Sequence, residues 1–142
     1  MNSFFFEVRT SRRIETIDIT RKIEERLPRT AAGICVVYCP HTTAAIAVNE
    51  GADPDVKTDI EDALTAHFPS TGRYRHAEGN SDAHIKSVLI GPSKIVPVEN
   101  GKLLLGRWQS IFFCELDGPR TRTVRAYVIA GSSATDPSAE YR

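Results

Sequence analysis

The sequence predicts an α+β fold: a single antiparallel, β-rich domain with two helices packed on the sheet. The chain has 142 residues, which is enough for one domain with a hydrophobic core. Most of its apolar stretches are short, rich in β-branched or aromatic residues, and separated by glycine and proline. Only two segments show the spacing of an amphipathic helix, and both lie in the first half of the chain. A second half that is almost entirely strand-like completes the pattern of an α+β domain.

Short apolar stretches bounded by turn residues predict the strands. In the first half of the chain they lie at residues 4–8, 14–17, 33–39 and 44–50. In the second half they lie at residues 85–90, 94–98, 103–105, 109–116 and 123–131. We expect the first two strands to pair as a hairpin and the later ones to form a meander. The two strands at 33–39 and 44–50 are apolar on both faces, so both should lie in the interior of a sheet.

Two segments have helical periodicity. Apolar residues recur every four positions over 19–27, immediately before Pro28, which predicts a short amphipathic helix. The clearer signal covers residues 53–68, where Asp53 is suited to cap the helix and Pro54 to occupy its first turn. One face of this second helix is apolar, so it should pack on the sheet.

The segment after the second helix has no apolar periodicity. Residues 70–82 are therefore expected to form a long loop, which ends directly in a strand that His84 opens. The globular domain should span residues 1–131, and residues 132–142 should form a flexible tail. Two helices cannot bury all of the apolar surface that strands with two apolar faces present. We therefore also expect self-association.

Composition narrows the class of protein. Eighteen basic residues balance eighteen acidic ones, so no nucleic-acid or membrane partner is expected. The N-terminal apolar patch is too short for a signal peptide, and no run approaches the ~20 apolar residues that span a bilayer. The three cysteines, Cys35, Cys39 and Cys114, lie in apolar runs and should be buried free thiols, typical of a reducing compartment. A cytoplasmic location is therefore expected.

Polar residues gather at three places, each at the end of a predicted strand. In the segment 76–87, HAEGNSDAHIKS, strand alternation would place His84 and Lys86 side by side. Such a cationic pair is costly to bury without an anion or a metal. The other two groups flank the strands at 44–50 and 109–116, and consist of His41, Thr42, Thr43, Asn49, Glu50, Trp108, Gln109, Glu115, Asp117 and Arg120. Each group alone is ordinary turn chemistry, but three of them in one small domain favour a shared site.

One interpretation of these groups is a metal site. His41, His76 and His84 would supply enough imidazoles for a metal with one open coordination position. Carboxylates would act as a general base or orient the ligands, and the candidates are Glu78, Asp82, Glu115 and Asp117.

The other interpretation is a site for a phosphate or diphosphate. Its cationic candidates are Lys86, Arg120 and Arg122, assisted by Ser87 and the backbone at Gly79 and Gly118. The chain has no Walker loop and no G-x-G-x-x-G, so an ordinary nucleotide-binding fold is not expected. It has no G-x-S-x-G either, which argues against a serine nucleophile.

Several long motifs occur in a fixed order: HTTAAIAVNE, DPDV, EGNSDAHIKS, G-x-W-Q and E-x-DGPR-x-R. Over about residues 5–131 they resemble the YjbQ-like family, whose members are also labelled secondary thiamine-phosphate synthases. The family's usual G-T-W-Q is here Gly106-Arg107-Trp108-Gln109, which puts a large cation, Arg107, where a small hydroxyl is usual. If that position lines the pocket, the substrate preference should differ.

The resemblance implies an α+β fold, a homotrimer and a reaction that joins an aminopyrimidine diphosphate to a thiazole phosphate, an activity regarded as secondary. It implies a divalent metal, zinc or magnesium, held by His41, His76 and His84. It places catalytic carboxylates at Glu78, Glu115 and Asp117. It places substrate-binding groups at Asn49, Glu50, Asn80, Gln109 and Arg120, to which the phosphate-site interpretation adds Lys86 and Ser87.

The leading hypothesis is thus a metal-dependent enzyme that acts on a small phosphorylated substrate. Two alternatives stay open. One is a metal-dependent hydrolase of a small phosphate or amide, and the other is a trimeric module that binds a metabolite without turning it over.

Overall fold

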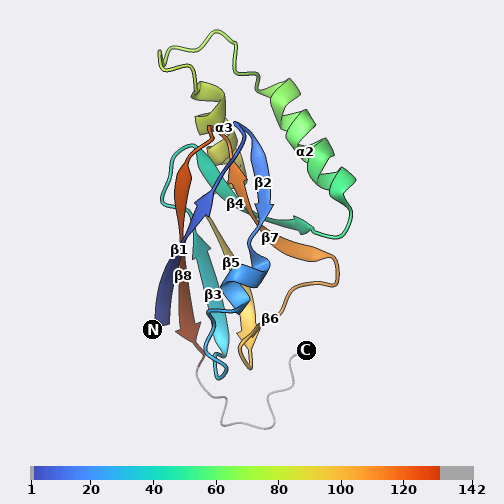
Figure 1. The fold of residues 1–142 in the computed structure, drawn as a ribbon, viewed down its shortest axis with the longest axis vertical. Helices are drawn as coiled ribbons and strands as arrows, with labels where there is room; N and C mark the ends of the chain where they lie inside the picture. Colours follow the sequence, from blue (N-terminus) through green and yellow to red (C-terminus); the bar gives the residue numbers. More distant parts are fainter. Residues whose placement is uncertain (1, 132–142) are drawn as a thin grey trace.

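The computed structural model describes residues 2–131, and it confirms an antiparallel, β-rich α+β domain (Figure 1). The proposed tail at 132–142 lies outside the described residues. The strands are β1 (Asn2–Arg9), β2 (Glu15–Asp18), β3 (Gly33–Tyr38), β4 (Ala44–Glu50), β5 (Ser93–Glu99), β6 (Lys102–Leu103), β7 (Gln109–Glu115) and β8 (Thr121–Ala130). The helices are α1 (Thr20–Glu24), α2 (Pro54–His67) and α3 (Ser81–Ile90).

The strands form two sheets. A five-stranded sheet has the order β1-β8-β3-β5-β6, and a three-stranded sheet has the order β2-β7-β4. The predicted hairpin between the first two strands is wrong, because β1 pairs with β8 and β2 pairs with β7. The chain crosses from one sheet to the other between β1 and β2, and this crossing binds the β7–β8 loop. There, the N–H of Thr10 donates to the carbonyl of Arg120, and the N–H of Gly118 donates to the carbonyl of Arg13.

One hydrophobic core joins the two sheets. Alternate residues of the five-stranded sheet point into it, and these include Val8, Cys35, Val37, Val124 and Ala126. The three-stranded sheet contributes Ile46, Ile111 and Phe113, and the segment around α1 adds Ile19 and Ile23. All of these side chains are at most 1% exposed. Alternation of side chains along these strands therefore builds one wall of the core from each sheet.

The three cysteines are free and buried, as predicted. Burial raises the pKa of the Cys35 and Cys39 thiols to about 11, and that of Cys114 to about 12. At neutral pH these groups are protonated, so they are poor nucleophiles and poor metal ligands.

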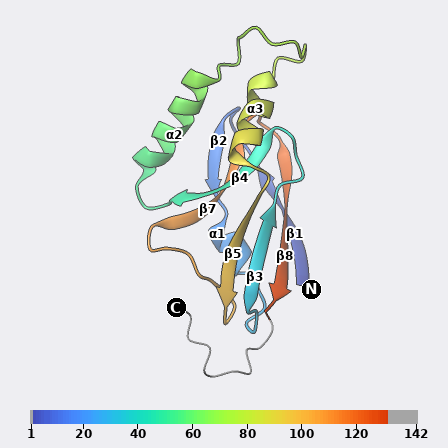
Figure 2. The same ribbon diagram turned by 180° about the vertical axis from the view of Figure 1, so that it is seen from behind.

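Helix α2 begins as predicted but packs less than predicted. The Asp53 side chain accepts a hydrogen bond from the N–H of Asp55 at 2.9 Å, and Pro54 occupies the first turn. No side chain of α2 is buried. Figures 1 and 2 both place the helix beside β2, on the side of the molecule away from β1 and β8. A hydrogen bond from the N–H of Thr16 to Glu61 Oε1, 2.9 Å long, ties it to that strand.

The predicted strand at 85–90 is wrong, because residues 81–90 form helix α3. Its buried side chains, Asp82, Ala83, Lys86 and Ser87, recur at helical spacing. The helix ends where Gly91 adopts φ 97° and donates its N–H to the carbonyl of Ser87. Apolar residues at 88–90 gave a strand-like signal, but Val88 and Leu89 are exposed in the structure. No helix within residues 2–131 is both long enough and apolar enough to span a membrane.

Candidate functional site

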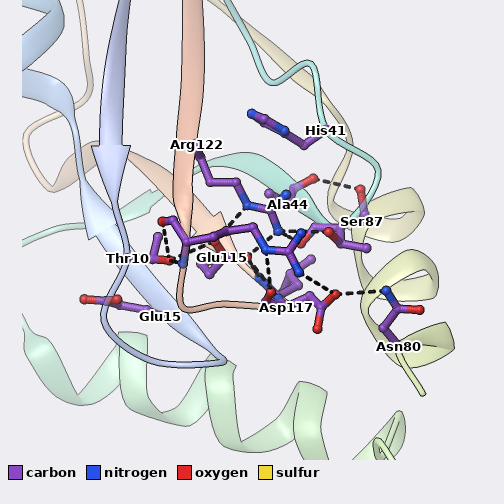
Figure 3. A network of polar contacts seen from close by, with 12 residues as sticks. Thr10, Glu15, His41, Ala44, Asn80, Ser87, Glu115, Asp117 and Arg122 are labelled. Atoms are coloured by element: carbon purple, nitrogen blue, oxygen red, sulfur yellow. Dashed lines mark hydrogen bonds and ion pairs between the residues drawn. The ribbon is translucent and has the colours of Figure 1, made fainter. Parts of the chain in front are cut away.

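Polar side chains from three connections meet at the α3 end of the molecule. Figure 3 shows them: His41 precedes β4, Asn80 precedes α3, and Asp117 follows β7. Inside this region lie two buried ion pairs, and beside it lie two hollows lined by histidine.

The first buried pair joins Glu115 and Arg122. Arg122 donates from Nη2 to Glu115 Oε1 at 2.6 Å and from Nε to Oε2 at 2.8 Å. Glu115 is 0% exposed and also accepts from the Thr10 hydroxyl and from the backbone N–H groups of Leu116 and Asp117. Burial alone would raise the pKa of Glu115, but the hydrogen bonds from Arg122 and the backbone outweigh it and hold the pKa below its ordinary value.

The second buried pair centres on Asp82. Arg13 donates to its two carboxylate oxygens at 3.0 and 2.9 Å, and Lys86 Nζ donates at 2.9 Å. Asp82 is 0% exposed and Lys86 is 1% exposed. Burial would raise the pKa of Asp82, yet the hydrogen bonds from Arg13 and Lys86 lower it overall. Lys86, expected beside His84 on a strand, therefore points inward from α3 and is already paired.

Four further predicted residues make hydrogen bonds around these pairs. Asn80 Nδ2 donates to Asp117 Oδ2 at 2.9 Å, and Arg120 Nη2 reaches the same oxygen at 3.1 Å. The Ser87 hydroxyl donates to the buried carbonyl of Ala44 at 2.8 Å, which ties α3 to β4. Oδ1 of Asn80 is buried and has no hydrogen-bond partner among the described residues.

His41 is held in one tautomer. Its Nε2 accepts a hydrogen bond from the N–H of Thr123 at 2.9 Å, so the proton of the neutral ring lies on Nδ1. Burial lowers the pKa of His41, and the positive charge of Arg122 lowers it further. His41 and His84 line one hollow of about 460 Å³ with Tyr38, Cys39, Pro40, Thr42, Ser87, Val88 and Pro92.

His84 also lines a second hollow, of about 500 Å³, with His76. The two imidazole rings lie edge to face, with centroids 5.4 Å apart. His76 Nε2 is 3.6 Å from Glu78 Oε2. We call this second hollow the basic recess; its other lining residues are Arg73, Tyr74, Arg75, Ser81 and Ile85. Sequence reasoning missed Arg73, Tyr74 and Arg75, although the run RYRH directly before the predicted ligand was a usable signal.

The three histidines do not form one cluster. His84 contacts His76 and shares a hollow with His41, but residues 2–131 contain no group of three His, Cys, Asp or Glu side chains spaced to hold a metal ion. Whether the protein binds a metal stays a prediction.

The remaining predicted residues lie at the other end of β4. Asn49, Glu50 and Gln109 line a third hollow, with Val48, Val56 and Trp108. Ala44, which contacts α3 through Ser87, is six residues from Glu50, so the two ends of the strand are roughly 20 Å apart. The predicted site residues therefore divide between two places.

Comparison with known proteins agrees with the fold and the motifs. Residues 5–131 match the family model described as UPF0047 protein YjbQ-like. The chain is 52% identical over 120 residues to the UPF0047 protein YugU of Bacillus subtilis, covering 82% of this chain and 91% of the relative. It is 47% identical over 128 residues to a UPF0047 protein of Methanocaldococcus jannaschii, covering 89% and 93%.

Solved structures give the same result. A conserved YjbQ/UPF0047 protein from Clostridium acetobutylicum superposes with a TM-score of 0.85 at 48% identity, over 89% of this chain and 99% of that one. A hypothetical protein from Aeropyrum pernix superposes with a TM-score of 0.87 at 41% identity, over 92% and 100%. The chain therefore belongs to the YjbQ-like UPF0047 family.

Proposed function

We propose that the protein is an enzyme that acts on a small phosphorylated substrate, whose phosphate binds in the basic recess. One observation carries this proposal: the recess is lined by two contacting imidazoles and two arginines, and the nearby carboxylate of Glu78 meets only His76. Concentrated positive charge in a half-open hollow has no structural purpose of its own, and it suits a phosphate or diphosphate.

The recess offers several donors to such an anion. Arg73 and Arg75 supply guanidinium groups, which bind phosphate oxygens in pairs. Ser81 adds a hydroxyl at the first position of α3, where helix N–H groups favour negative charge. His84 lies between the recess and the His41 hollow, so it is placed to transfer a proton between a bound phosphate and the rest of the substrate. His41 would contribute a fixed Nδ1–H donor.

The first reaction to test is the joining of an aminopyrimidine diphosphate to a thiazole phosphate. As diphosphate leaves, negative charge grows on its oxygens, and the positive charge of the recess would stabilise it.

The buried carboxylates are less suited to direct catalysis. Glu115, for example, is fully buried and already accepts hydrogen bonds at both oxygens.

The predicted zinc or magnesium ion fits the three histidines poorly. Nε2 of His41 already accepts the N–H of Thr123, and Nδ1 carries the proton, so neither nitrogen offers a free lone pair. The function proposed above therefore includes no step at a metal. Elemental analysis of the purified protein is the direct check on metal content.

The basic recess is testable by binding and turnover together. Inorganic diphosphate should bind in calorimetry, and the double variant Arg73→Ala/Arg75→Ala should bind it at least ~10-fold more weakly, because two charge-assisted contacts are lost. Arg9→Ala, which removes an exposed arginine on β1, should bind as the wild type does. Equal affinity in the double variant would refute the recess as the anion site. Binding without product from the two thiamine precursors or a panel of phosphate esters would favour the metabolite-binding module instead.

We also propose self-association through the outer face of the five-stranded sheet, with the homotrimer as the expected state. Strand register places Ile34 opposite Ile129 and Val36 opposite Ile95 on that face. Ile95 is 64% and Ile129 is 45% exposed within one chain. A continuous apolar face of this kind is typical of a protein interface.

Light scattering checks the oligomer. The wild type should have the mass of a trimer at micromolar concentration, and Ile95→Glu should reduce it by placing a charge in the interface. Leu89→Glu, at an exposed apolar residue on α3 rather than on that sheet, is the matched control and should leave the mass unchanged. A wild-type mass equal to one chain would exclude the interface.

A further inference from the structure

The hollow at the far end of β4 has features of its own, independent of the basic recess. It is a shallow, open hollow of about 400 Å³, lined by Val48, Asn49, Glu50, Val56, Trp108 and Gln109. We refer to it as the Trp108 hollow. Since it lies roughly 20 Å along β4 from the histidines, a small substrate held in the recess does not reach it.

The indole of Trp108 is exposed, yet its backbone is held firmly. The side chain is 58% exposed. The Gly106 N–H donates to Gln109 Oε1 at 2.8 Å, and the Gln109 N–H donates back to the Gly106 carbonyl at 3.0 Å. On the other side, the Gly51 N–H donates to the Trp108 carbonyl at 2.8 Å. A large apolar ring presented to solvent from a fixed turn is an arrangement suited to binding.

The ring already binds a cation from its own chain. The guanidinium carbon of Arg107 lies 5.0 Å from the centroid of the indole. This distance is within the range of a cation–π interaction, for which tryptophan is the best aromatic partner. The Trp108 ring is thus accessible to a positive charge.

A carboxylate beside the ring lacks a donor. Oε2 of Glu50 is buried and accepts no hydrogen bond within residues 2–131. Leaving a buried carboxylate oxygen without a donor is costly, so the site favours a ligand that supplies one. The terminal torsion of a glutamate is soft, so rotation about it is the movement by which this oxygen would reach a ligand in the hollow. Asp53 and Asp55, at the start of α2, add negative charge near Val56.

We propose that the Trp108 hollow is a second ligand site, which binds a small alkyl amine in its protonated form. The ammonium group donates to Glu50 and lies against the indole, and the alkyl chain packs on Val48 and Val56. Arg107 competes with the ligand for the ring, so its presence lowers the affinity. This site does not depend on the phosphate chemistry proposed for the recess.

The chain's single tryptophan makes the test direct, because its fluorescence reports on this hollow alone. At constant ionic strength, n-butylammonium should change the emission saturably, with a Kd in roughly the millimolar range expected for so few atoms. Butanol, which lacks the charge, and tetramethylammonium, which lacks an N–H donor, should each bind at least ~5-fold more weakly. Equal binding of butanol would reduce the site to an apolar surface and overturn the proposal.

Two substitutions separate the role of the Glu50 carboxylate from that of the Arg107 guanidinium. Glu50→Gln should weaken n-butylammonium about 10-fold, because it removes the charged acceptor. Arg107→Gln should tighten it about 2-fold to 5-fold, because it frees the ring. Glu99→Gln, at an exposed acid on β5, should have no effect. Unchanged affinity in both Glu50→Gln and Arg107→Gln would refute the site, and the Arg107 variant still decides the matter if the Glu50 variant fails to fold.

Discussion

Two polar regions share the α3 end of the molecule, and they differ in how their charges are satisfied. In the interior, Glu115 and Asp82 are fully buried and each accepts several hydrogen bonds from charged partners. In the basic recess, His76 and His84 are only partly covered, and the two arginines beside them are exposed. Charged residues at one end of a fold are therefore of two kinds: those whose partners are buried inside the protein, and those that solvent and the ligand proposed above can reach.

The interior pairs also position the basic recess and the adjacent hollow that His41 lines. Arg122 donates to both the carbonyl and the hydroxyl of Thr43, two residues after His41. Thr123, which follows Arg122 in the chain, donates its backbone N–H to the His41 ring. The Asp82 pair fixes α3, which carries His84 on a different side. The buried charges thus contribute to the site through geometry rather than by contact with a substrate.

The largest expected effect on stability comes from breaking a buried pair. Arg122→Ala should lower the free energy of unfolding by about 3–5 kcal/mol, because it leaves the Glu115 charge buried without its partner. Urea unfolding measures this. Replacing both residues together, Glu115→Leu with Arg122→Met, should be much less harmful, since no charge is then orphaned. A loss below ~1 kcal/mol in the single variant would mean that the pair is not structural.

A smaller effect should appear with pH. The folded-state pKa values of Asp82 and Glu115 are lowered, so the unfolded chain binds protons more readily. Their contribution is fully present above the ordinary carboxyl pKa values of 3.8 and 4.5, and is lost as pH falls through the lowered values. We therefore expect the free energy of unfolding to fall between pH 7 and pH 3, measured by urea titration at each pH. Asp82→Asn should flatten part of this dependence; an unchanged slope would contradict the assignment.

The smallest effect on stability should come from the recess. His76→Ala and His84→Ala should each change the free energy of unfolding by no more than about 0.5 kcal/mol, because neither ring is buried. His84→Ala should nevertheless abolish turnover of the phosphorylated substrate. A destabilisation as large as that of Arg122→Ala would place these histidines with the interior pairs, and it would erase the distinction between the two regions.

Most of the strands were predictable because a short apolar stretch bounded by glycine and proline is a signal that each segment carries by itself. Helix α3 was not predictable, because Ile85 and the apolar residues at 88–90 resemble a strand. The buried face of the helix carries the charged residues Asp82 and Lys86, and their burial is explained only by the ion pair of Asp82 with Arg13. A charged pair contributed from 69 positions away leaves no local pattern.

The site was predicted in part for a similar reason. Polar groups at strand ends were recognised, and those around His41, His84 and Asp117 do lie at one end of the molecule. Asn49 and Glu50 were placed with them, but they close the strand whose opposite end follows His41. Residues that are close together in the motif HTTAAIAVNE can therefore lie at opposite ends of one strand, separated in space by the length of that strand.

Helix α2 adds no buried side chain, and no strand pairing involves the segment from 51 to 80. A change of length there would leave every ladder of both sheets intact, provided that it spared the hydrogen bonds of Gly51 to Trp108, Thr16 to Glu61 and Asn80 to Asp117. This segment also carries Arg73 and Arg75 into the recess. If the recess binds the phosphate proposed above, its choice of ligand can therefore diversify by insertion or deletion without any change in the hydrophobic core.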